Sequence, residues 1–212
     1  MQALRGDLHY LNFKMQELSE CNKCSRIVKN LADLRLTYPN YQNKPIAPVP
    51  CKKAFLCIVG LAPGLSGANR TGKIFDGDFS GNILSKALEL SRYTKSDDYL
   101  YPYITNAVKC FPPKNKPIAS EINNCNRYLS DELKSLKYLK VIIVLGATAH
   151  NSVLKSYSLS RKDNKFSHGN IHQLSKNIVL IDSYHCSKIN IYTKRLTLSM
   201  LVDIFKLAMI YK

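Results

Sequence analysis

Glycines and two aspartates are concentrated in residues 60–81, which read GLAPGLSGANRTGKIFDGDFSG. Glycine allows the backbone to turn sharply and to approach a ligand closely. Loops of this kind often carry function. The two carboxylates, Asp76 and Asp78, therefore lie in a loop that we expect to form part of an active site.

A phosphate-binding loop is the alternative interpretation, because glycine-rich turns before helices bind anions through backbone N–H groups. Residues 67–73 approach the pattern GxxxxGK[ST]. However, Ile74 stands where that pattern needs a hydroxyl, and the chain has no GxGxxG. Two aspartates also disfavour an anion, so the loop is predicted to hold something other than a nucleotide phosphate.

Cysteine spacing indicates a second site. The chain has seven cysteines and its N-terminus lacks a signal-peptide core, so we do not expect a disulfide framework. Cys21 and Cys24 form a CxxC, and Cys110 and Cys125 lie in a polar segment that contains prolines. Cys57 lies in an apolar run and is expected to be packed in the core. A metal ion or an iron–sulfur cluster bound by the CxxC pair together with Cys110 and Cys125 would account for these four cysteines. Their spacing alone does not choose between zinc and iron.

The charge balance points to a polyanionic partner. Lys plus Arg number 31 against 15 Asp plus Glu, a formal charge of +16. Such an excess indicates nucleic acid. The apolar runs are only strand-length, so we expect no membrane partner and a cytoplasmic location. The length of 212 residues predicts a single domain over residues 1–212, and we expect it to be a monomer.

Apolar runs that alternate with helical patterns must position these sites. The expected strands are residues 54–59, 101–108, 141–145 and 178–182. The expected helices are residues 1–20, 82–90, 121–139, 147–155 and 196–208. Residues 30–53 contain four prolines and are expected to form a long connection with at most a short helix.

This alternation predicts a fold class. Strands that are apolar throughout and alternate with helices indicate a three-layer α/β/α sandwich with a central, mostly parallel four-stranded sheet. In such folds ligands bind beyond the carboxyl ends of the strands. Residues 60–81, 106–113 and 183–190 are therefore expected to converge.

Four motifs carry a resemblance to a known family. They are GLAPG (60–64), GANRTGKIFDGDFSG (67–81), NAVKCFPPKNKP (106–117) and SYHCSKINIYTKRLT (183–197). Together with the four cysteines, they resemble a family-five, or type B, uracil-DNA glycosylase over most of the chain. The resemblance implies hydrolysis of the N-glycosidic bond of uracil in double- or single-stranded DNA, which leaves an abasic site, with other deaminated bases as further candidate substrates.

The resemblance also implies roles for individual residues. An iron–sulfur cluster of the [4Fe–4S] type would be bound by Cys21, Cys24, Cys110 and Cys125. Asp78 corresponds to the carboxylate that positions water, with Asp76 as the second candidate, and His185 to the histidine that contacts the O2 carbonyl of uracil. The residues implied to surround the flipped base are Gly60, Ala62, Gly64, Phe75, Asn106, Ser187 and Asn190.

Base recognition is assigned to two of these residues. Phe75 would stack on the base, and the Asn106 amide would accept from N3–H, which distinguishes uracil from cytosine. Cys186 replaces the usual proline of the His-Pro-Ser motif, a change that removes a stiffening residue. The candidate phosphate contacts are Ser187, Thr193, Lys194, Arg195, Lys109, Lys114 and Lys116, and the candidate wedges are Ile189 and Tyr192.

Two other classes of protein stay open at this point. One is a noncatalytic, zinc-stabilised DNA-binding module, which would use the basic surface and the four cysteines. The other is an iron–sulfur electron-transfer protein. Visible absorbance distinguishes a cluster from zinc, and a uracil excision assay distinguishes an enzyme from a binding module.

Overall fold

The computed structural model describes residues 17–49, 51, 53–93 and 99–212. The helix predicted over residues 1–20 lies outside this part of the chain, except that residues 17–19 are helical. Within the described ranges no helix is both long enough and apolar enough to cross a membrane.

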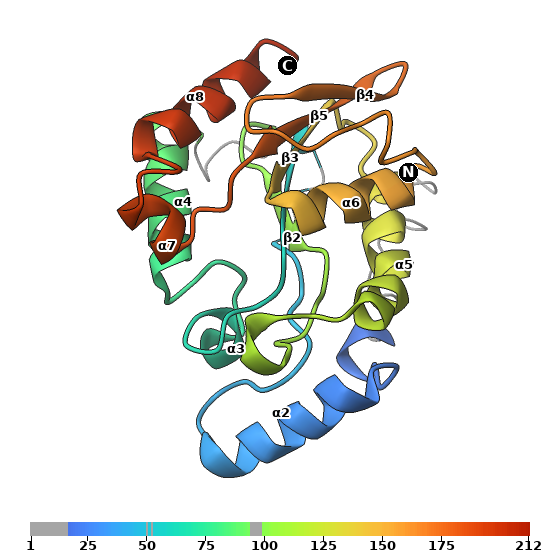
Figure 1. The fold of residues 1–212 in the computed structure, drawn as a ribbon, viewed down its shortest axis with the longest axis vertical. Coiled ribbons are helices and arrows are strands. Elements are labelled where there is room, and N and C mark those ends of the chain that lie inside the picture. Colours follow the sequence, from blue (N-terminus) through green and yellow to red (C-terminus); the bar gives the residue numbers. More distant parts are fainter. Residues whose placement is uncertain (1–16, 50, 52, 94–98) are drawn as a thin grey trace.

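Five strands form one sheet in the order β2-β1-β3-β5-β4 (Figure 1). The four parallel strands are β1 (Leu56–Gly60), β2 (Tyr103–Asn106), β3 (Val141–Leu145) and β5 (Ile178–Ser183). They coincide with the four predicted apolar runs, which confirms the mostly parallel sheet.

The predicted strand number is wrong by one. The fifth strand, β4 (Ile171–Ser175), pairs antiparallel with β5 at the edge of the sheet. Only Leu174 of its five residues is buried. An edge strand with so little apolar burial leaves no apolar run in the sequence.

Helices cover both faces of the sheet, which confirms the three-layer α/β/α sandwich (Figure 1). One layer contains α4 (Phe79–Leu90) and α8 (Leu198–Met209), and the other α5 (Ala119–Ser135) and α6 (Ala147–Ser156). Side chains of β1 alternate between the layers. Ile58 packs in the apolar cluster of α4 and α8, whereas Cys57 packs in that of α5 and α6. Cys57 is thus a core residue, as expected.

The helix that precedes the sheet is longer than the short one allowed for residues 30–53, and it begins before them. α2 (Ser25–Thr37) occupies residues 30–37 of the segment expected to be largely a connection, and it ends just before the first of the four prolines. Only Ile27 and Leu31 of this helix are buried, so its apolar stripe is too narrow for a clear periodic pattern. α2 lies at the end of the molecule farthest from α8 (Figure 1).

Three short helices lie in the loops that follow the carboxyl ends of the strands. They are α3 (Ala68–Thr71) after β1, the 3₁₀-helix η1 (Pro113–Asn115) after β2, and α7 (Lys188–Tyr192) after β5. Residues from all three loops line one pocket, so the predicted convergence of these loops is confirmed.

Candidate active site

A pocket of about 270 Å³ lies at the carboxyl ends of β1, β2 and β5. The residues predicted from sequence that line it are Ala62, Gly64, Phe75, Asp78, Asn106, His185 and Ser187. The lining residues not singled out beforehand are Leu61, Pro63, Ala68, Ser80 and Asn115. All five lie within the motifs 60–64, 67–81 and 106–117, so their position beside the predicted residues was the signal that could have identified them.

Asp78 is fixed by the start of helix α4. Its Oδ1 accepts a 2.9 Å hydrogen bond from the backbone N–H of Gly81, so that Asp78 is the N-cap of the helix. Its other oxygen lies where a Cβ on Gly67 would have to stand, and this is the reason for glycine there. Asp76, in contrast, is exposed and does not line the pocket. The structure therefore separates the two aspartates.

Asn106, the last residue of β2, carries an unpaired acceptor. The residue is 3% exposed, and its Oδ1 has no hydrogen-bond partner among the described residues. Buried polar atoms in native proteins are nearly always hydrogen-bonded, so an orphan in a pocket indicates a donor on a ligand. The Phe75 ring lies beside it, with a backbone φ of 50°. This left-handed conformation is strained for a phenylalanine and is typical of functional sites.

His185 enters the pocket from the loop after β5. Burial lowers the pKa of His185, and the negative charge of Asp78 opposes this shift only in part. At pH 7 the imidazole is therefore neutral and has one N–H to donate.

The loop around His185 is held from both sides. Asn190 does not line the pocket; instead its Nδ2 donates a 2.8 Å hydrogen bond to the carbonyl of His185. Cys186, in the place of a proline, is fully buried, and its Sγ lies 3.5 Å from the carbonyl oxygen of Ser80. Core packing at Cys186 thus anchors the loop where a proline would have stiffened it.

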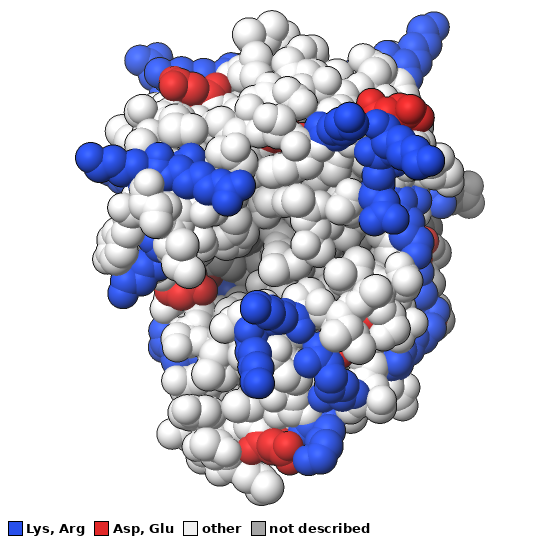
Figure 2. Space-filling model, in the orientation of Figure 1, with Lys and Arg blue, Asp and Glu red and all other residues white. Residues whose placement is uncertain are grey.

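The surface around these loops is basic. Figure 2 shows many more Lys and Arg than Asp and Glu side chains on one face, around a central hollow. Ile189 and Tyr192 of α7 are 74% and 67% exposed, as a wedge requires. Lys114 and Lys116 are also exposed.

The buried position of Lys109 contradicts what was predicted for it from sequence. It was predicted to face the DNA backbone with its neighbouring lysines, but it is 1% exposed. Its Nζ lies 2.7 Å from Oε2 of Glu132 in the protein interior, so it is not available to a phosphate. That prediction was wrong.

The four predicted ligand cysteines come together beside α2. All four belong to the apolar cluster that α2 forms with α5 and the segment after β2. Burial, and then the charges of the neighbouring cysteines, raise the pKa of Cys110. Burial also raises the pKa of Cys125 to about 11, although Lys109 opposes this shift. A site for thiolates therefore needs a compensating cation, because these thiols would otherwise stay protonated at pH 7.

A separate cluster of polar side chains lies under β5. Asp182 accepts hydrogen bonds from Nδ1 of His150 at 2.6 Å and from Nε2 of His172 at 2.9 Å. The backbone N–H of Ser167 also donates to Asp182, at 3.1 Å. This cluster joins α6 and β4 to the strand that leads into His185. This cluster was not predicted from sequence, although an aspartate at the end of an apolar strand was a visible signal.

Fold and pocket together define an α/β protein with a pocket of polar and apolar residues at the carboxyl ends of its strands and a group of four cysteines beside α2. The family model for the Uracil DNA glycosylase superfamily matches residues 48–207. The chain belongs to this superfamily, as its motifs predicted.

Known proteins are similar to the chain over most of its length. A Type-5 uracil-DNA glycosylase from Pyrobaculum aerophilum is 35% identical over 207 residues, which cover 92% of this chain and 90% of that protein. One from Thermus thermophilus is 36% identical over 203 residues, which cover 90% of this chain and 93% of that protein. A Type-4 uracil-DNA glycosylase from Archaeoglobus fulgidus is 29% identical over 175 residues, with 81% and 78% covered. These similarities do not favour a noncatalytic binding module.

Proposed function

We propose that this protein hydrolyses the N-glycosidic bond of uracil in DNA and leaves an abasic site. One observation carries the proposal: Asp78, His185 and the unpaired amide oxygen of Asn106 belong to a single pocket. The relatives named Type-5 uracil-DNA glycosylase support it. We further propose that residues 1–212 act as one domain, as a cytoplasmic monomer.

Uracil is selected by its hydrogen-bonding edge. A base turned out of the duplex enters the pocket, where Oδ1 of Asn106 accepts from its N3–H and the Phe75 ring stacks on its face. Cytosine has no hydrogen on N3, so it would leave Oδ1 unpaired. A buried acceptor without a partner costs about 1–3 kcal/mol, which is enough to disfavour cytosine.

Different residues act on the two groups that the glycosidic bond joins, the base and the sugar. As the bond between C1′ and N1 breaks, its electron pair goes to the base. The neutral imidazole of His185 donates a hydrogen bond to O2, where negative charge grows. Asp78 holds the water that adds to C1′ and accepts its proton, and the carboxylate also favours the positive charge on the sugar.

The four cysteines would hold an iron–sulfur cluster of the [4Fe–4S] type. The four cysteines offer an all-thiolate donor set at one place in the fold, which suits an iron–sulfur cluster, and zinc is the alternative metal for the same donors. When bound, the cluster would cross-link the residues just before α2, the segment after β2, and α5.

DNA is the partner that the charge and the exposed side chains support. The +16 charge favours association with phosphates. Ile189 or Tyr192 would fill the gap that the flipped nucleotide leaves in the stack. Asn190 supports the pocket indirectly, because its hydrogen bond to the backbone carbonyl holds His185 in place.

A single-turnover assay on a duplex with one uracil tests the proposal. The protein is expected to release uracil and to leave an alkali-labile abasic site. The matched duplex with cytosine in place of uracil should stay intact. Absence of uracil release by iron-replete protein would contradict the enzyme assignment, and equal release of cytosine would contradict the role of Asn106.

A further inference from the structure

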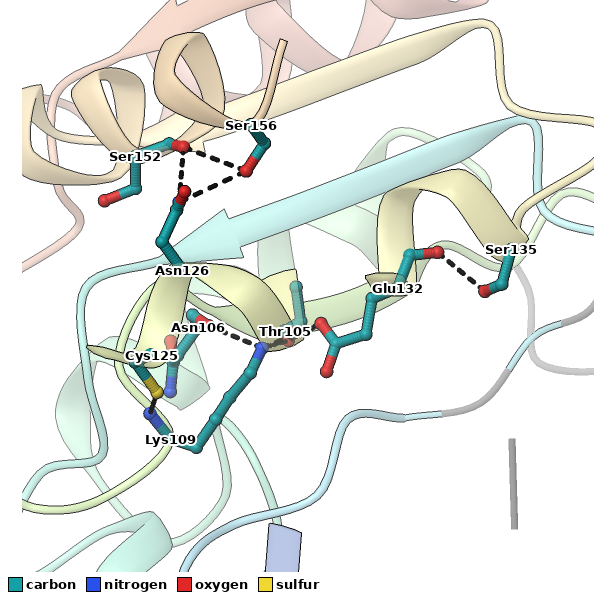
Figure 3. Close-up of polar contacts among 9 residues, drawn as sticks. All are labelled: Thr105, Asn106, Lys109, Cys125, Asn126, Glu132, Ser135, Ser152 and Ser156. Carbon is teal, nitrogen blue, oxygen red and sulfur yellow. Dashed lines mark hydrogen bonds and ion pairs between the residues drawn. The ribbon is translucent and has the colours of Figure 1, made fainter. Parts of the chain in front are cut away.

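Lys109 is a buried lysine with all its hydrogen-bond donors in use (Figure 3). Its Nζ lies 2.6 Å from Oγ1 of Thr105, 2.7 Å from the backbone oxygen of Asn106 and 2.7 Å from Oε2 of Glu132. The Thr105 hydroxyl donates its own hydrogen to Glu132 at 2.7 Å, so it can only accept from Lys109. Three acceptors require three hydrogens, and Lys109 is therefore a fully satisfied ammonium.

Bonds from the same residue reach the cysteine site. The backbone N–H of Lys109 donates to Sγ of Cys125 at 3.2 Å, and the next residue along the chain is Cys110. Glu132, the counter-ion, lies two turns further along α5 than Cys125. Lys109 thus ties the segment after β2 to the helix that carries a cysteine ligand.

Towards the pocket, Lys109 acts on the backbone of Asn106. The bond from Nζ fixes the carbonyl of Asn106 and so the peptide plane that leaves its Cα. On the other side of this Cα is the amide whose Oδ1 is unpaired in the pocket. The side chain leaves the same Cα, so a rotation of the backbone at Asn106 would turn the amide with it.

We propose that Lys109 is a positioning residue that holds Asn106 in place for base recognition and couples that residue to the four-cysteine site. The inference rests on the proposed function, since it takes Asn106 as the residue that reads the base. A purely structural buried ion pair is the competing account, because removing one partner of such a pair is destabilising wherever it occurs.

A double-mutant cycle distinguishes the two accounts. Lys109→Met is expected to lower single-turnover excision of uracil by about 10-fold or more in the wild-type background. In an Asn106→Ala background the same change should cost less than about 3-fold, because the residue through which Lys109 acts is gone. Equal losses in both backgrounds would overturn the proposal. Lys134→Met, an exposed site on α5, is the matched control and should keep the wild-type rate.

A second variant removes the effect of unpaired charge. Lys109→Met leaves Glu132 buried without its partner, whereas Lys109→Met with Glu132→Met removes both charges. The double variant is expected to regain the unfolding midpoint and iron content that Lys109→Met loses, yet to excise uracil at least about 10-fold more slowly than wild type. Recovery of the wild-type rate together with stability would overturn the proposal.

These readouts separate this proposal from the proposed function. If the wild type releases uracil and Lys109→Met does so equally fast, the positioning role fails and the glycosylase assignment stands. If the wild type releases no uracil, the glycosylase assignment fails and the positioning role fails with it.

Discussion

The side-chain oxygen of Asn106 lies against Gly60, in the space where any other residue would carry its Cβ. The two residues face each other in register at the ends of β2 and β1. The Phe75 ring reaches the same space. A missing side chain on one strand thus makes room for the amide and the ring that line the pocket.

Gly60→Ala is expected to displace both Asn106 and Phe75. The backbone of Gly60 is not in the left-handed region, so alanine can adopt it and the fold should survive. Single-turnover excision should fall by about 10-fold or more, with a near-normal circular dichroism spectrum. A folded Gly60→Ala protein with wild-type activity would contradict the packing described for this wall.

The parallel strands and the pocket could be predicted from sequence for one physical reason. Each parallel strand is buried on both faces and is therefore apolar along its length, and the pocket loops follow those strands directly. β4 was missed because four of its five residues keep contact with solvent. β4 forms because it pairs with β5, and the local sequence pattern does not reveal this pairing.

Lys109 was misjudged because burial depends on distant partners. It lies in a lysine-rich stretch whose other members, Lys114 and Lys116, are exposed. Its counter-ion, Glu132, is 23 residues away on a different element. Nothing local distinguishes a solvated lysine from one that meets a carboxylate after folding.

Cysteine substitutions test the cluster. Cys110→Ser is expected to lose iron and visible absorbance and to unfold at lower temperature, because the ligands join distant parts of the chain. Cys57→Ala is the matched control, since Cys57 is buried in β1 outside that group and should keep its iron. Wild-type protein with stoichiometric zinc and no iron would contradict the assignment.

The buried His150 predicts a pH dependence of stability. Burial lowers the pKa of His150, but the hydrogen bond and charge of Asp182 outweigh this, and the net shift is upward from 6.5. A raised pKa in the folded state means that the stabilisation is fully present below pH 6.5 and is lost as pH rises through the raised value.

His150→Gln should therefore make the unfolding midpoint less dependent on pH above about 6.5, because the substitution removes the titrating group. The measurement is thermal unfolding of both proteins across this range. A wild-type slope in His150→Gln would show that other groups cause the dependence.

Salt dependence tests the DNA-binding face. Affinity for undamaged duplex should fall steeply with salt, because phosphate contacts release counterions. Replacing the exposed Lys114 and Lys116 together by alanine should reduce the slope of log affinity against log salt by up to about 1.8 if both contact phosphates. An unchanged slope would exclude them from the interface.

The most direct test of the account is the effect of Asp78→Asn on single-turnover excision of uracil. Asparagine is also a good N-cap, so α4 should be retained. The rate is expected to fall on the order of 10²-fold or more while duplex binding survives. Asp76→Asn, on an exposed residue outside the pocket, should stay close to wild type. Uracil excision by Asp78→Asn at the wild-type rate would contradict the proposed mechanism.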